Sequence, residues 1–195
     1  MPRPSARRHL LDTAATLVVT EGPAALTYDR VAENAEVSKG GMLYHFPTKA
    51  LLIEALLDDV LDGFEDTVDA AVAASAAVGD GAAGGGSSTP GAWARAYVDA
   101  TFDVEVSRPD LALALLVASP EAGAELMERC ARRFAAWQVR LAADGLPAAT
   151  AALVRYACDG WWTLRAFAPD AAAEDAPVLR RHLHALLDGA QAVPV

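Results

Sequence analysis

Apolar residues recur along most of the chain with the spacing of an α-helix. Between residues 5 and 22, Leu10, Ala14 and Leu17 share one helical face, and Gly22-Pro23 ends the pattern. A longer segment begins after Thr48, with leucine, isoleucine and valine on one side and aspartate and glutamate on the other. These patterns predict amphipathic helices that each bury one face.

The remaining segments show the same period, and prolines at positions 109, 120, 147, 169 and 177 separate several of them. Residues 79–91 contain six glycines and no large apolar side chain, which predicts a flexible loop. No segment has the pattern of a strand, so we predict an all-α fold of about nine helices. The expected helices are residues 5–22, 28–35, 39–46, a long helix after 48, then 93–107, 109–118, 121–143, 148–168 and 177–188.

Composition excludes several classes of protein. The 195 residues are 53% hydrophobic, which is enough for a packed core, but no apolar run approaches the roughly 18–20 residues of a membrane helix. Asp12 and Thr13 interrupt the only N-terminal stretch that could resemble a signal peptide. Cys130 and Cys158 are too few for a disulfide framework or a zinc site. We expect a cytoplasmic protein without a membrane partner.

Charge is unevenly distributed along the chain. The formal net charge is −10, yet residues 1–50 carry six basic and five acidic side chains, whereas residues 51–195 carry 10 basic and 21 acidic ones. The first eight residues include three arginines and no acid. An acidic body with a near-neutral head is compatible with DNA binding confined to one end.

Residues 27–49 have the layout of a helix-turn-helix. Two short helices, capped by Thr27 and Ser38, are joined by residues 35–37, and the second begins with Lys39-Gly40-Gly41. Two glycines at a helix start cost about 1 kcal/mol each against alanine. The absence of a Cβ lets a backbone approach another surface closely, which suits a helix that lies against DNA.

The same stretch carries a family resemblance. Its residues are Thr27-Tyr28, Val31-Ala32, Ala35, Val37-Ser38-Lys39-Gly40-Gly41, Leu43-Tyr44-His45-Phe46-Pro47, Lys49 and Leu51-Leu52. This run resembles the signature of the TetR/AcrR family of bacterial repressors over about residues 8–55. Residues 106–111 and 156–167 also resemble the branch of that family that regulates multidrug efflux.

The resemblance implies a domain organisation and a set of DNA contacts. Residues 1–48 would form the DNA-binding domain, and residues 49–195 the ligand-binding and dimerisation domain. Leu43 and Phe46 would be core residues of a three-helix head, and Tyr28 could belong partly to that core. The residues expected to contact a palindromic operator are Thr27, Tyr28, Lys39, Gly40, Gly41, Tyr44, His45 and Lys49.

The sequence of residues 49–195 carries weaker signals for ligand binding and dimerisation. Candidate ligand-binding residues are Trp93, Asp99, Phe102, Phe134, Trp137 and Trp161, with ordinary core packing as the alternative for each aromatic ring. Asp99 and Asp103 lie four residues apart beside Phe102, a combination that suits a cationic aromatic ligand, although a solvated acidic edge is the alternative. Asp159, which precedes Trp161 and Trp162, is a similar case. Candidate dimer contacts are Leu179, Leu183, Leu186 and Leu187, which could instead pack within one subunit.

Together these features indicate a homodimeric, ligand-responsive repressor released from operator DNA by a small, largely apolar or cationic aromatic inducer. A sensor of an endogenous metabolite with the same head, acting as repressor or activator, is the alternative. A further alternative is an apolar-pocket binding protein or enzyme without DNA function, but no G-x-S-x-G, Walker or H-E-x-x-H motif is present. We expect no cofactor and no metal.

Overall fold

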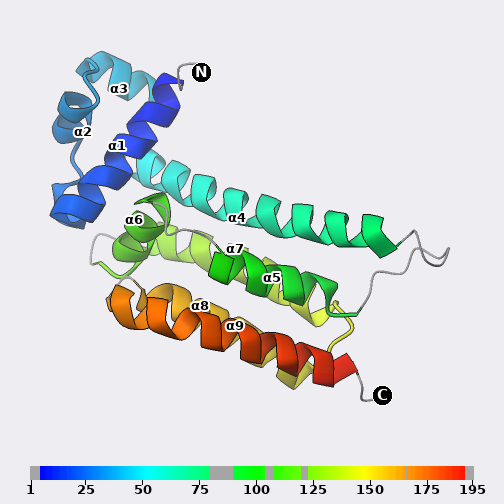
Figure 1. Ribbon diagram of the computed structural model, residues 1–195. Coiled ribbons are helices and arrows are strands. Elements are labelled where there is room, and N and C mark those ends of the chain that lie inside the picture. Colours follow the sequence, from blue (N-terminus) through cyan, green and yellow to red (C-terminus); the bar gives the residue numbers. More distant parts are fainter. Residues whose placement is uncertain (1–4, 80–89, 104–107, 120–122, 166, 192–195) are drawn as a thin grey trace. The chain divides into compact units, whose positions relative to one another are not determined.

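The computed structural model describes residues 5–79, 90–103, 108–119, 123–165 and 167–191, and these residues form nine α-helices, a single-turn 3₁₀ helix and no strand (Figure 1). The all-α prediction is confirmed. The elements are α1 Ala6–Glu21, η1 Pro23–Ala25, α2 Tyr28–Asn34, α3 Lys39–His45, α4 Lys49–Gly79, α5 Ala92–Asp103, α6 Arg108–Val117, α7 Ala124–Ala142, α8 Ala148–Leu164 and α9 Pro169–Gln191. Most of the predicted flexible loop, residues 80–89, lies outside the described part.

The last two helices differ from the expectation. The helix predicted to end at residue 168 ends at Leu164, and α9 begins at Pro169, eight residues before the expected start at Pro177. Proline is favoured in the first turn of a helix, and Asp170 complements the helix dipole there. The alanine-rich residues that follow have high helix propensity, so α9 continues through Pro177. Within the described residues, no helix is long and apolar enough to cross a membrane.

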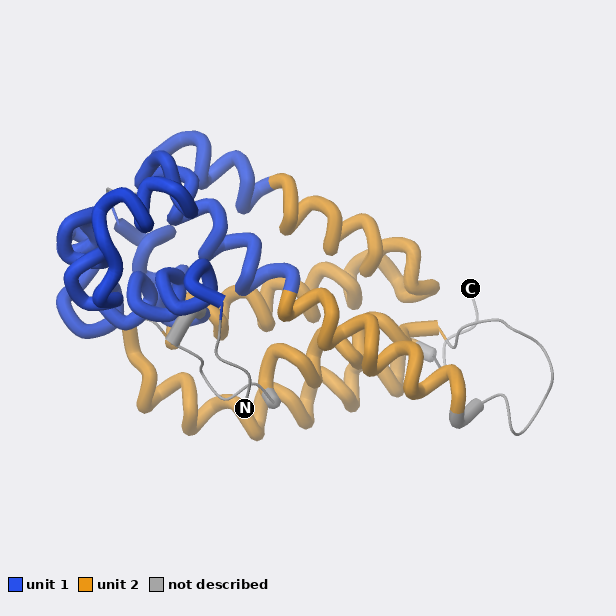
Figure 2. The backbone as a smooth tube through the Cα atoms, turned by 90° about the horizontal axis from the view of Figure 1, so that it is seen from above, with its two compact units in different colours: residues 1–62, 106–131 blue, residues 63–105, 132–195 orange. Residues whose placement is uncertain are grey.

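The chain divides into two compact units, coloured separately in Figure 2. The first comprises residues 1–62 and 106–131, and in it α1 packs against α2, η1 and α6. Its core is aliphatic, with one aromatic ring: the fully buried side chains include Leu10, Leu11, Leu26, Met42, Phe46, Leu52, Leu56, Leu57, Leu113 and Leu116. These units do not follow the boundary drawn at residue 48, because α4 begins in the first unit and ends in the second.

One arginine ties two helices of the first unit together. Arg129, on α7, makes a two-pronged contact with Asp58, with Nε 3.0 Å from Oδ1 and Nη2 2.6 Å from Oδ2. Its Nη1 also lies 3.3 Å from the Glu54 carboxylate, one turn earlier on α4. This fork geometry is the strong form of an arginine–carboxylate pair.

The second unit comprises residues 63–105 and 132–195, in which α5, α8 and α9 pack against one another. Asp144 caps the start of α5 from a distant point in the sequence, since its carboxylate accepts hydrogen bonds from the backbone N–H groups of Trp93 (3.2 Å) and Ala94 (2.8 Å). The indole N–H of Trp161 donates to the Ala172 carbonyl at 2.7 Å, which joins α8 to α9.

Candidate nucleic-acid interface and ligand site

The helix-turn-helix is built by local capping. Thr27 accepts a 3.4 Å hydrogen bond from the Arg30 N–H at the start of α2, and Ser38 accepts one of 3.1 Å from the Gly41 N–H at the start of α3. Between the helices, Glu36 adopts a φ of 54°, a left-handed backbone conformation that costs about 1–2 kcal/mol for a residue with a Cβ. The turn therefore keeps its shape because both flanking helices hold it.

The inner face of α3 differs by one residue from the expectation. Phe46 is buried as predicted, but Leu43 is 43% exposed, and its neighbour Met42 has no exposed surface. Met42 and Phe46 are four residues apart, so they share one helical face, from which Leu43 is turned by about 100°. The assignment of Leu43 to the core was therefore wrong, and Leu43 lies on the surface of the head.

The outer face of α3 presents three of the predicted DNA-contacting residues to solvent. Lys39, Gly40 and Tyr44 are exposed, and the Tyr44 side chain is the most exposed large apolar group of those described, at 83%. The Tyr44 and His45 rings meet edge to face with centroids 5.1 Å apart. The Lys39 ammonium pairs with Asp29 on α2 at 3.0 Å.

Gly40 and Gly41 are not required by packing within the protein. A Cβ on Gly40 would meet only the Ser38 hydroxyl, at 3.9 Å, and a Cβ on Gly41 would meet the same hydroxyl at 3.4 Å. Both are ordinary or nearly ordinary contact distances. The reason for two glycines therefore lies outside the described fold, as expected if another surface approaches this turn of α3.

Tyr28 and Lys49, two further predicted DNA contacts, are less exposed than the outer face of α3. The Tyr28 hydroxyl donates a 2.6 Å hydrogen bond to the Phe46 carbonyl, so this side chain fastens α2 to the end of α3, and burial raises its pKa. Thr27 is exposed, and its hydroxyl hydrogen remains available to an acceptor. Lys49 is half-buried at the start of α4, where it borders a cleft of about 470 Å³ against the start of α7.

The predicted ligand-binding aromatics fall into two groups within the second unit. Trp137 contacts Phe134 with ring centroids 5.3 Å apart, and Trp93 stacks on Tyr97 at 5.2 Å. Phe64 contacts both Trp137 and Tyr97, so the five rings form one continuous aromatic cluster. Phe102 and Trp161 form a separate pair at 4.8 Å. Trp93, Trp137 and Trp161 are buried, so these three rings act as core residues in this structure.

Asp99 cannot serve as an unpaired carboxylate for a cationic ligand. Its Oδ1 accepts hydrogen bonds from Arg180 Nε (3.0 Å) and Nη2 (2.8 Å) on α9, and it lies 2.8 Å from His184 Nε2. Two basic groups of the protein already contact it, so the cation-binding role expected for Asp99 is wrong, while its side chain remains 38% exposed at the surface. The Asp103 side chain lies outside the described part of the chain.

Asp159 is a second carboxylate that lies beside aromatic rings. Asp159 accepts a 2.6 Å hydrogen bond from the Tyr97 hydroxyl, beside the aromatic cluster, and burial raises the pKa of both groups. The sequence placed Asp159 next to tryptophans, but nothing in the spacing of residues 97 and 159 indicated that they meet. Cys158 lies beside this pair, and burial raises its pKa to about 12, which leaves the thiol unreactive at neutral pH.

The predicted dimer leucines divide between core and surface. Leu187 has no exposed surface and Leu183 only 7%, so both pack within their own chain and are corrected from partner contacts to core residues. Leu179 is half-buried and Leu186 is exposed. An apolar surface nevertheless runs along α8 and α9; we call it the α8–α9 stripe, and it consists of Leu153, Tyr156, Leu164, Val178 and Leu186.

Comparisons with known proteins agree with this arrangement. Residues 10–56 match the family model of bacterial regulatory proteins of the tetR family, and residues 91–188 match that of a tetracyclin repressor-like C-terminal domain. No curated protein matches the sequence closely enough to count as a relative.

Solved structures resemble the chain over nearly its whole length. The multidrug binding protein EbrR complexed with malachite green is 25% identical, with 98% of this chain and 100% of that chain covered and a TM-score of 0.67. A TetR transcription regulator from Haloarcula marismortui is 16% identical, covers 95% and 97%, and has a TM-score of 0.73. SmeT in its triclosan complex is 16% identical, covers 97% and 91%, and has a TM-score of 0.68. The helix-turn-helix, the helical C-terminal half and these matches together show that the chain belongs to the TetR family of transcription regulators, which are not enzymes.

Proposed function

We propose that this regulator is a repressor that binds a palindromic operator as a homodimer and leaves it when a small, largely apolar or cationic aromatic inducer binds. Residues 1–48 would read the DNA, and residues 49–195 would bind the inducer and the partner subunit. Such a protein acts where the chromosome is, in the cytoplasm.

The DNA-binding role is supported above all by the outer face of α3. Lys39, Gly40 and Tyr44 are exposed together, and the glycines leave room that no contact within the protein uses. Lys39 can donate to guanine edges in the major groove, while Tyr44, His45 and Lys49 can bind phosphates on either side. Thr27 would add a phosphate contact at the start of α2, with Tyr28 holding α2 and α3 in register.

Dimerisation is supported by the α8–α9 stripe. A seven-residue recognition helix reads few base pairs, so two copies are needed for useful affinity and selectivity. Five large apolar side chains exposed along two adjacent helices are typical of a surface covered by a partner. Leu186 stays in this proposed interface, with Leu179 at its edge.

The charge preference of the inducer is supported by Asp159. Asp159 is a half-buried carboxylate at the edge of the aromatic cluster, where it can serve as the counter-ion of a flat cation. The rings of Trp93 and Tyr97 are buried here, so they would have to separate before a ligand could stack on them. EbrR, the similar multidrug binding protein, was solved with malachite green, a cationic aromatic dye. The alternative, a metabolite sensor with the same head, predicts indifference to such dyes.

One experiment tests the core of the proposal. Fluorescence anisotropy with the protein's own promoter fragment should show salt-sensitive, sequence-selective binding, which Lys39→Ala and Tyr44→Ala weaken by at least about tenfold. Arg132→Ala, which removes a positive charge from exposed α7, is the matched control and should bind as the wild type does. Malachite green should release the DNA. If Lys39→Ala and Tyr44→Ala bind DNA as tightly as the wild type, the proposed DNA interface is refuted. If malachite green leaves DNA binding unchanged, only the proposed class of inducer is refuted.

A further inference from the structure

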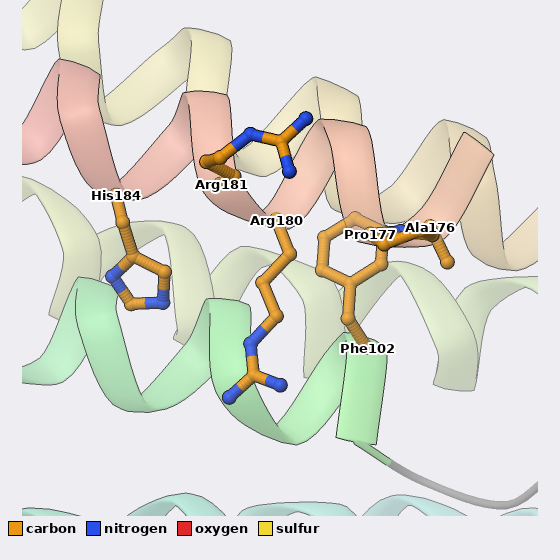
Figure 3. Close-up of a pocket in the computed structure, with 6 residues that line it drawn as sticks. All are labelled: Phe102, Ala176, Pro177, Arg180, Arg181 and His184. Carbon is orange, nitrogen blue, oxygen red and sulfur yellow. The ribbon is translucent and has the colours of Figure 1, made fainter.

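A cleft of about 450 Å³ lies between α5 and α9 in the second unit. Figure 3 shows its lining: Phe102 from α5, and Ala176, Pro177, Arg180, Arg181 and His184 from α9. Arg180 and His184 point toward α5, and the Phe102 ring points back toward Pro177. Neither the DNA-binding face nor the α8–α9 stripe includes any of these residues, so the cleft is a separate feature of the protein.

The lining combines one aromatic wall with three basic groups. Asp99 borders the cleft from α5, and its Oδ1 receives both Arg180 and His184. One carboxylate thus orients two basic side chains by hydrogen bonds of 2.8–3.0 Å. Arg181, the adjacent residue on α9, also lines the cleft and contributes a second guanidinium, with its side chain running along α9 (Figure 3). Asp99 itself is not among the residues that line the cleft, so the charged side chains of the described lining are basic.

We propose that this cleft binds a small organic anion with a flat aromatic body. The guanidinium of Arg181 is planar and presents parallel N–H donors, so it can hold a carboxylate by two hydrogen bonds. The ring of the ligand packs on Phe102 and Pro177, which supply an apolar surface beside that charge. The volume suits a molecule of one or two rings.

The ligand expected in this cleft has the opposite charge to the inducer proposed for Asp159. The proposal does not depend on whether the cleft affects DNA release. Asp99 already holds Arg180 and His184, so Arg181 supplies the positive charge that a ligand in the cleft would meet. A cationic ring would meet Arg181 here and be repelled by it.

The test is calorimetric titration of the full-length protein with 2-naphthoate, 2-naphthamide and 2-naphthylmethylammonium, which share one ring system and differ in charge. We expect 2-naphthoate to bind at least about tenfold more tightly than either analogue, because one charge-assisted hydrogen-bonded pair changes the binding constant by about tenfold or more. Arg181→Gln should weaken naphthoate binding about tenfold, and Arg181→Lys should restore part of it.

Arg181 is exposed, so the substitution should leave the fold intact, and circular dichroism checks this. Arg132→Gln carries the same charge change on α7 and should leave affinity within twofold of wild type. Phe102→Leu should weaken naphthoate and the neutral amide alike. Equal affinity for the three probes, no detectable naphthoate binding, or equal losses in Arg181→Gln and Arg132→Gln would each overturn the proposal.

Discussion

The ammonium of Lys39 lies 3.0 Å from the carboxylate of Asp29, across the turn that separates α3 from α2, and the two side chains remain 68% and 80% exposed. An ion pair so open to water contributes about 0–1 kcal/mol, so it does little for stability. We expect its effect to be on binding, because the carboxylate would compete with DNA for the lysine.

Asp29→Asn should therefore strengthen DNA binding. The substitution frees Lys39 and removes a negative charge beside the phosphates, so we expect the promoter Kd to fall about two- to fivefold and to depend more steeply on salt. Anisotropy titrations at several salt concentrations measure both effects. In the Lys39→Ala background the gain should shrink to the part that comes from removing the negative charge. A gain of undiminished size there would show that Asp29 acts by general repulsion alone.

Gly40→Ala should separate stability from DNA binding. An added methyl meets only the Ser38 hydroxyl at 3.9 Å, and alanine favours the helix, so stability should be equal or higher by up to about 1 kcal/mol. DNA affinity should fall at least about tenfold, because the methyl occupies the space needed for close approach. Gly63→Ala on α4 is the control: its site is also open, so it should stabilise the protein and leave DNA binding unchanged.

Asp159 should make stability depend on pH in a direction opposite to most carboxylates. Burial raises its pKa in the folded protein, so the folded state holds the proton more tightly than the unfolded state. Its contribution is therefore most favourable below the ordinary aspartate pKa of about 3.9 and is lost as the pH rises through the raised value.

Asp159→Asn should remove this pH-dependent loss. Its free energy of unfolding, measured with urea, should therefore rise relative to that of the wild type as the pH increases from 4 to 8. Burial also raises the pKa of Asp144, so the difference between wild type and variant isolates Asp159. Asp66→Asn, an exposed change of the same kind on α4, should give no such trend. A parallel gain in both variants would contradict the assignment to Asp159.

Asp144→Ala should destabilise the second unit. The carboxylate accepts from the first N–H groups of α5, and loss of a cap costs about 1–2 kcal/mol. Asp144→Asn retains an acceptor and should cost less. Denaturant unfolding gives both values, and equal costs would show that the charge, rather than the acceptor, matters.

Leu153→Glu should convert the proposed dimer to monomer. A charge in the α8–α9 stripe would be buried without a partner on association, which costs several kcal/mol, while in the monomer it remains in solvent. Sedimentation equilibrium measures the change. Val139→Glu, at a 69% exposed position on α7, is the control and should leave the dimer intact. Monomers at all concentrations in the wild type would refute dimerisation.

The fold class and the helix-turn-helix could be predicted because both depend on local pattern. Thr27 and Ser38 cap helices within three residues of themselves, and such signals are readable in order along the chain. Helix limits were less accurate where two local signals conflicted, as at Pro177, where the alanines on its N-terminal side outweighed the proline.

Contacts between residues far apart in the sequence could not be predicted. The sequence shows that Asp99 lies near Phe102, but not that Arg180 and His184, more than 80 residues away, bind its carboxylate. The same limit applies to Tyr97 and Asp159, which are 62 residues apart. In both cases charge and aromatic character were visible, while the pairing depends on how α5 packs with α8 and α9.

Arg129 has a mechanical consequence for the first unit. Because its fork grips Asp58 and also reaches Glu54 one turn away, the first turns of α4 cannot roll about their own axis without breaking the grip. Lys49 projects from the same end of α4. We therefore expect a displacement of the start of α7 to move the start of α4, and Lys49 with it.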